Sequence, residues 1–94
     1  MNVVDKPFDW DEEKNEWLKQ HRGVGFEDVV IAINLDKVLD VFNHHNQSRY
    51  PGQSIVVFEK NGYAYLAPFV EDEEKIFFKT ITPSRKATKK YLKK

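Results

Sequence analysis

The sequence predicts one small α+β domain in which an antiparallel sheet packs against helices. Three observations lead to this class. Apolar residues recur at helical spacing in the first third of the chain, short β-branched and aromatic runs separated by turn residues fill the middle, and a basic segment follows the last proline. The chain has 94 residues, the length of a single domain, here 1–94. The expected order is α-α-β-β-β-β-α, with the helices on one face of the sheet.

Two helices are expected before the sheet. Asp9 and Glu12 have the spacing of a capping box and begin the first helix, and Gly23 is expected to end it. The second helix is indicated by an i, i+3, i+4, i+7 stripe, which consists of Phe26, Val29, Val30 and Ile33. The residues expected to contribute to the helix–sheet core are Trp10, Trp17, Phe26, Val29 and Ile33.

Four strands and a last helix are expected after residue 37. The strands are 38–42, 54–59, 63–70 and 75–82, and a helix capped by Ser84 covers 85–94. Asn61 and Gly62 predict a two-residue type I′ hairpin turn, because this turn needs positive φ at both central residues. Pro68 removes one backbone donor, which predicts an edge strand or a bulge there.

Composition excludes several classes of protein. The absence of cysteine excludes disulfides and thiolate metal sites. No apolar run approaches the roughly 20 residues of a membrane span, and the first residues lack the basic and apolar regions of a signal peptide, so we expect a cytoplasmic protein with no membrane contact. No phosphate-binding glycine loop and no nucleophile elbow is present, and we expect no cofactor.

The three histidines do not predict a metal site. His44 and His45 are adjacent and His21 is distant, so the sequence has no H-x-x-x-H or H-E-x-x-H spacing. Adjacent residues in a polar loop rarely point at one ion, and solvated side chains are the more common outcome.

The charge distribution is uneven although the formal net charge is zero. Residues 1–40 contain ten acids and five bases, whereas residues 83–94 contain no acid and six bases: Arg85, Lys86, Lys89, Lys90, Lys93 and Lys94. Such a basic end favours contact with phosphate, and a solvated terminal helix is the alternative.

RNA cleavage through the 2′-hydroxyl fits this distribution. It needs a base for the hydroxyl proton, a donor for the leaving oxygen and positive charge near the phosphate. The start of a helix at Arg85 offers N–H groups and a guanidinium that binds phosphate with two hydrogen bonds. The loop before the second strand adds Arg49, Tyr50, His44 and His45. The rings of the tyrosine and the histidines are also suited to stacking on a base.

Two motifs resemble those of a known family. Residues 8–14 read Phe-Asp-Trp-Asp-Glu-Glu-Lys, and residues 23–28 read Gly-Val-Gly-Phe-Glu-Asp. Residues 84–90 read Ser-Arg-Lys-Ala-Thr-Lys-Lys. These stretches resemble the opening Phe-Glu-Trp-Asp-x-x-Lys with its following Gly-Val-x-Phe-Glu-Glu, and the closing Ala-Arg-Arg-Ala-Thr-Arg-Lys, of the BrnT toxins of bacterial toxin–antitoxin pairs. The middle of the chain matches in pattern only.

The resemblance implies a RelE-like fold and a metal-independent endoribonuclease that inhibits translation. It also implies a cognate antitoxin, through which alone the toxin would reach operator DNA. Arg85 takes the position of the arginine after the last strand, and we expect it to be the main phosphate ligand. Lys86 and Arg49 would assist it, and His45 or Tyr50 would transfer a proton. The residues expected to bind the RNA substrate are Lys89, Lys90 and Lys14.

The chain departs from the family pattern at three positions. Arg22 replaces the histidine before Gly-Val, Leu18 replaces an asparagine, and Thr80 replaces an arginine. Lys79 is next to Thr80 but would face the opposite side of a strand. An interaction module that keeps the fold and the antitoxin contact without turnover is therefore a second hypothesis, and a structural domain with another partner is a third.

Overall fold

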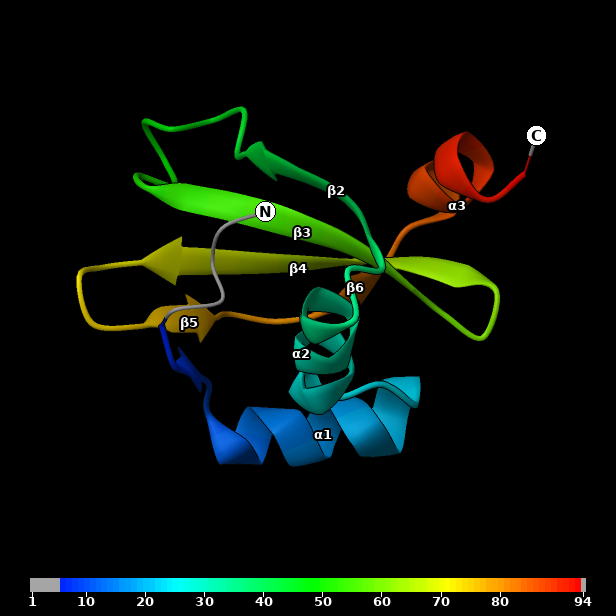
Figure 1. The fold of residues 1–94 in the computed structure, drawn as a ribbon, viewed down its shortest axis with the longest axis horizontal. Coiled ribbons are helices and arrows are strands. Elements are labelled where there is room, and N and C mark those ends of the chain that lie inside the picture. The colour runs from blue at the N-terminus through cyan, green and yellow to red at the C-terminus, as the bar shows by residue number, and fades with distance from the viewer. Residues whose placement is uncertain (1–5, 94) are drawn as a thin grey trace.

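The computed structural model describes residues 6–93, so the predictions on residues 1–5 and on Lys94 lie outside it. The described residues form a six-stranded sheet and three helices, arranged as in Figure 1. The elements are β1 (Phe8–Asp9), α1 (Glu12–Arg22), α2 (Phe26–Asn34), β2 (Val38–Asn43), β3 (Gln53–Lys60), β4 (Tyr63–Glu71), β5 (Ile76–Phe78), β6 (Thr82–Pro83) and α3 (Arg85–Tyr91). The predicted α+β class is confirmed.

The start of the first helix differs from the prediction. Asp11 caps α1, because its side chain accepts hydrogen bonds from the N–H groups of Glu13 and Lys14 at 2.9 and 3.4 Å. Asp9 lies in β1 instead, and its carboxylate accepts the N–H of Trp10. Both aspartates are capping residues by type, and Asp11 has the free backbone N–H groups of the helix directly after it. The end was predicted correctly, since Gly23 takes a left-handed conformation with φ 67°.

The main core lies between the first two helices and one face of the sheet (Figure 1). Phe26, Val29 and Ile33 of α2 are buried there, and Trp10 packs against the same cluster. The predicted contribution of Trp17 is wrong, because its side chain on the outer side of α1 is 40% exposed.

The hairpin prediction is confirmed. Asn61 and Gly62 have φ values of 54° and 79°, and they join β3 to β4 with Lys60 opposite Tyr63. The register continues along both strands, so that Val56 faces Ala67 and Phe58 faces Tyr65. This pair of long strands is the centre of the sheet.

The predicted fourth strand is split. Residues 76–78 form β5 and residues 82–83 form β6, and both pair with β4 on the same side. Pro68 lies in β4 between these two pairings, where it has no N–H to offer a neighbouring strand. Residues 79–81 lie opposite residues 67–68, so the register shifts by one residue at Pro68 as the predicted bulge requires, whereas the edge alternative is wrong because β4 has neighbours on both sides. The proline interrupts the ladder on one side of an interior strand.

The sheet is mixed rather than antiparallel. The strand order is β1-β5-β4-β3-β2, and β1 pairs parallel to β5 with Phe8 opposite Ile76. A two-residue strand has no periodicity to detect, so the pattern at Phe8 and Asp9 gave no sign of it.

The helices cover both faces, which corrects the expected one-sided arrangement. α1 and α2 pack on the face that presents Val56 and Phe58, whereas α3 packs on the opposite face, where Ala87 meets Val57 and Ala64 (Figure 1). Alternation along β3 places these two sets on opposite sides. Within residues 6–93, every helix is too short or too polar to serve as a membrane span.

Candidate functional site

A groove of about 340 Å³ lies between α3 and the sheet face that α1 and α2 leave uncovered. Its apolar part consists of Phe42, Ile55, Val57, Leu66 and Ala87. Its polar part consists of His45, Ser84, Lys86, Lys90 and Tyr91. Lys86 and Lys90 are the charged side chains among residues 6–93 that line the groove, and the Asp40 carboxylate next to it is bound by the Tyr91 hydroxyl, so the rim of the groove is positive.

The phase of α3 decides which basic side chains reach the groove. Ser84 caps the helix by accepting the N–H of Ala87 at 3.0 Å. Lys86 and Lys90 are one turn apart and both line the groove. Arg85 and Lys89 form the neighbouring row, are exposed, and do not line it.

Two side chains hold α3 against the sheet. The buried Thr88 accepts the N–H of Ala64 at 2.9 Å through its hydroxyl oxygen and donates to the carbonyl of Ser84 at 2.7 Å. Tyr91 donates its hydroxyl to Asp40 Oδ2 on β2. This hydrogen bond and the nearby negative charge raise the pKa of Tyr91, which makes it a poor proton donor to substrate.

The second wall of the groove is the loop between β2 and β3. His44 stacks on His45 with ring centroids 4.9 Å apart, and its ring is tilted by 35° against that of Tyr50 with centroids 4.3 Å apart. The guanidinium carbon of Arg49 lies 5.7 Å from the centre of the Tyr50 ring. We call this row of side chains, Arg49–Tyr50–His44–His45, the aromatic ladder; its His45 end lines the groove.

Hydrogen bonds order the loop that carries the ladder. Asn46 donates its N–H to His44 Nδ1 at 3.0 Å, which leaves Nε2 to carry the proton of the neutral ring. Gln47 Nε2 donates to the carbonyls of His44 and Gln53 at 2.7 and 3.1 Å, and Gln47 Oε1 accepts the N–H of Gly52 at 3.0 Å. The loop therefore has a defined conformation although it is exposed.

The structure brings together part of the predicted site. His45, Lys86 and Lys90 line one groove, and Tyr50 and Arg49 join it through His44. Arg85 and Lys89 lie beside the groove on α3.

Lys14 lies apart from the groove, on the helix layer across the sheet. Its ammonium is 4.8 Å from the centre of the Trp17 ring, and the guanidinium of Arg22 is 5.0 Å from that ring centre. Of the positions that depart from the family pattern, Leu18 is fully buried in the main core and Arg22 donates to the carbonyl of Ile81. Leu18 and Arg22 therefore have structural contacts far from the groove.

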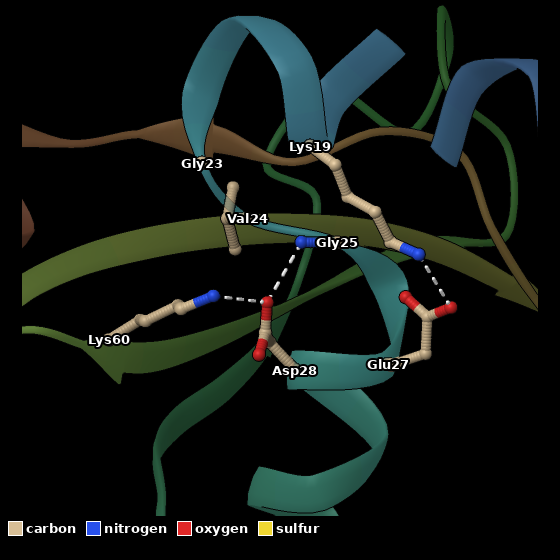
Figure 2. A pocket seen from close by; sticks show the side chains of 7 residues that line it. All are labelled: Lys19, Gly23, Val24, Gly25, Glu27, Asp28 and Lys60. Carbon is tan, nitrogen blue, oxygen red and sulfur yellow. Dashed lines mark hydrogen bonds and ion pairs between the residues drawn. The ribbon is translucent and has the colours of Figure 1, made fainter. Parts of the chain in front are cut away.

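A second depression lies where α1 meets α2 (Figure 2). Lys19 pairs with Glu27 at 3.1 Å and Lys60 pairs with Asp28 at 2.8 Å, while Asp28 Oδ2 also accepts the N–H of Gly25 at 2.8 Å. These opposite charges neutralise one another, and we assign this depression to the stability of the fold.

A buried asparagine, Asn15, lies beside this second depression and bonds to Glu27. Asn15 Oδ1 accepts the N–H of Phe26 at 2.8 Å, and Asn15 Nδ2 donates to both carboxylate oxygens of Glu27 at 3.0 Å. Burial raises the pKa of Glu27, but the hydrogen bonds from Asn15 and Lys19 outweigh it and hold this pKa below its ordinary value.

Asn15 and Asp40, whose side chains hold the helices beside these sites, were missed by sequence reasoning. Asn15 follows Lys14 on the first helix, where a polar residue on the core side is the only available signal. Asp40 interrupts a β-branched run, which is a signal that an acid there has a partner.

Within residues 6–93, no three His, Cys, Asp or Glu side chains gather in a way that could hold a metal ion. No protein-family model, no curated protein and no solved structure matches this chain.

Proposed function

We propose that this chain is the toxin of a bacterial toxin–antitoxin pair and that it cleaves RNA in the groove between α3 and the loop 44–52. The observation that supports the proposal is that His45, Lys86 and Lys90 line the same groove. An imidazole and two ammonium groups in one groove can supply both the proton transfer and the positive charge that phosphate chemistry requires.

The chemistry assigns a role to each side chain. His45 accepts the proton of the 2′-hydroxyl, whose oxygen attacks the adjacent phosphorus. Lys86 and Lys90 bind the phosphate oxygens and stabilise the negative charge that develops on them. One of these ammonium groups donates a proton to the departing 5′ oxygen, which gives a 2′,3′-cyclic phosphate and a 5′-hydroxyl end.

Arg85 remains a predicted phosphate ligand at the flank of the groove. Arg85 is exposed and precedes Lys86 on α3, and we expect it to contact a neighbouring phosphate of the bound strand. We therefore expect Lys86 to contribute more to the rate than Arg85, which reverses the order expected from the sequence.

The test is RNA cleavage by purified protein, with variants chosen in pairs. Lys86→Ala should lower the cleavage rate by about 10²–10³, in the range of a lost donor to a developing oxyanion. Lys89→Ala removes the same charge from the same helix outside the groove, and we expect a change of only a few fold. His45→Ala should also abolish cleavage, and an excess of chelator should leave the wild-type rate unchanged.

Expression in bacteria tests the toxin role. The chain alone should arrest growth, and co-expression of the antitoxin should restore it. We expect an acidic antitoxin segment to cover α3, so that complex formation slows as salt is raised. A folded chain that binds a partner but neither cleaves RNA nor arrests growth would favour the non-catalytic interaction module instead.

A further inference from the structure

The apolar part of the groove has no role in the chemistry proposed above. Phosphate binding needs only the ammonium groups at the rim, yet Phe42 and Leu66 present an apolar surface beneath them, with the buried Ile55 under it. Phe42 is 41% exposed, and Leu66 is only partly buried, so this surface is accessible. A ligand that fits the groove therefore has an apolar, flat part as well as an anionic part.

The aromatic ladder points to what the flat part is. His44 and His45 stack with their ring planes 20° apart, and His44 covers one side of His45. His45 is nevertheless exposed and lines the groove, so part of its side chain is accessible to a ligand that enters. A nucleobase inserted there would extend the ladder by one ring, and base–aromatic stacking is a general source of affinity for single strands.

We infer that the groove is a nucleobase pocket: one unpaired base stacks on His45 above the apolar floor, while its phosphates lie on Lys86 and Lys90. This inference rests on the proposed RNA substrate and names its class as single-stranded RNA. The apolar lining favours a nucleotide over an acidic peptide, because an acidic side chain has no flat apolar part to occupy the floor and stack on the ladder.

The size of the groove makes it selective for single strands. A volume of about 340 Å³ is at the small end of the range of ligand pockets, large enough for one nucleotide. In a duplex the bases are stacked and paired within the helix, so none can enter without being unpaired first. Duplex RNA would reach only the lysines at the rim.

Binding measured with uncleavable RNA tests this inference apart from catalysis. The probes are a labelled 2′-O-methyl RNA oligonucleotide, the same strand annealed to its complement, and a series in which one nucleotide at a time lacks its base. By fluorescence anisotropy, the single strand should bind at least tenfold more tightly than the duplex. One position of the series should lose about tenfold in affinity when its base is removed.

The decisive comparison crosses the protein variant with the missing base. His45→Ala should weaken binding of the intact strand about tenfold, and removing the critical base should then have no additional effect. His21→Ala is the matched control, because His21 also stacks on an aromatic ring, Trp17, but does so on α1 across the sheet. We expect it to bind both strands as the wild type does.

Each outcome separates this inference from the proposed function. Equal affinity for duplex and single strand, or a series without a critical base, overturns the nucleobase pocket even if RNA is cleaved. Base-dependent binding of a chain that cleaves no RNA supports the pocket and refutes the ribonuclease. Absence of any RNA binding overturns both.

Discussion

Asn15 gives the sharpest test of how the fold is held together. It is fully buried between α1 and α2, and its side-chain oxygen accepts the N–H of Phe26 at 2.8 Å. Replacing it with alanine leaves that buried donor without a partner, which costs about 1–3 kcal/mol. The two hydrogen bonds to Glu27 are also lost, but water can replace them because the Glu27 side chain is 49% exposed. We count them as about 1 kcal/mol.

The gain in helix propensity opposes this loss. Alanine is favoured over asparagine by up to about 0.7 kcal/mol in a helix interior, so Asn15→Ala should lower the free energy of unfolding by about 2–3 kcal/mol. A domain of this size has about 5–15 kcal/mol in total, and the melting temperature should therefore fall by about 10–20 °C.

Urea denaturation followed by circular dichroism measures this difference. Asn34→Ala is the control, since Asn34 is an exposed asparagine near the end of α2, and its replacement should change stability by less than about 0.5 kcal/mol. If the two variants were equally stable, Asn15 would not be the polar link between the helices.

Three further predictions follow from the same structure. Phe26→Ala should cost about 3–5 kcal/mol in urea denaturation, because the fully buried ring stacks on Trp10 with centroids 5.6 Å apart; a loss below about 1 kcal/mol would contradict its place in the core. The lowered pKa of Glu27 stabilises the fold above the unfolded-state pKa, and this contribution is lost as pH falls through the folded-state value. Stability curves between about pH 6 and 3 should therefore be flatter in Glu27→Gln than in the wild type, and parallel curves would refute the assignment. Gly62→Ala should destabilise the hairpin by about 1 kcal/mol, because φ is 79° there, whereas an unchanged melting temperature would show that the turn tolerates a side chain.

The elements that the sequence predicted are those with a strong local signal. Asn61 and Gly62 fix their turn through positive φ, and Phe26, Val29 and Ile33 mark one face of a helix whatever lies opposite. The prediction that Asp9 caps the first helix was wrong because the local signal was ambiguous. The capping propensity of Asp9 is local, but so is that of Asp11 two residues later, and the parallel pairing of β1 with β5 decided between them.

Features that depend on distant partners were beyond the sequence. Burial of Asn15 depends on α2 packing across α1. The hydrogen bond of Tyr91 joins it to Asp40, which lies 51 positions earlier in the chain and on a different element. The split between β5 and β6 lies opposite Pro68 of β4; its missing donor is visible in the sequence, but the segment that faces it is not. None of these has a periodicity in its own segment.

In the short helix α3 of the candidate site, too, some features were predictable from the sequence and others depended on distant partners. The basic composition of α3 is visible in the sequence, and so is its start at Ser84. Which lysines face the sheet follows from the phase of the helix, and the phase is set by Ala87 and Thr88, the two buried residues of α3. Ala87 is small enough to let the helix approach Val57, and Thr88 bonds to the backbone of β4. With those two residues inward, Lys86 and Lys90 line the groove and Arg85 and Lys89 lie beside it, so enlarging Ala87 should disturb the groove more than removing any single charge of α3.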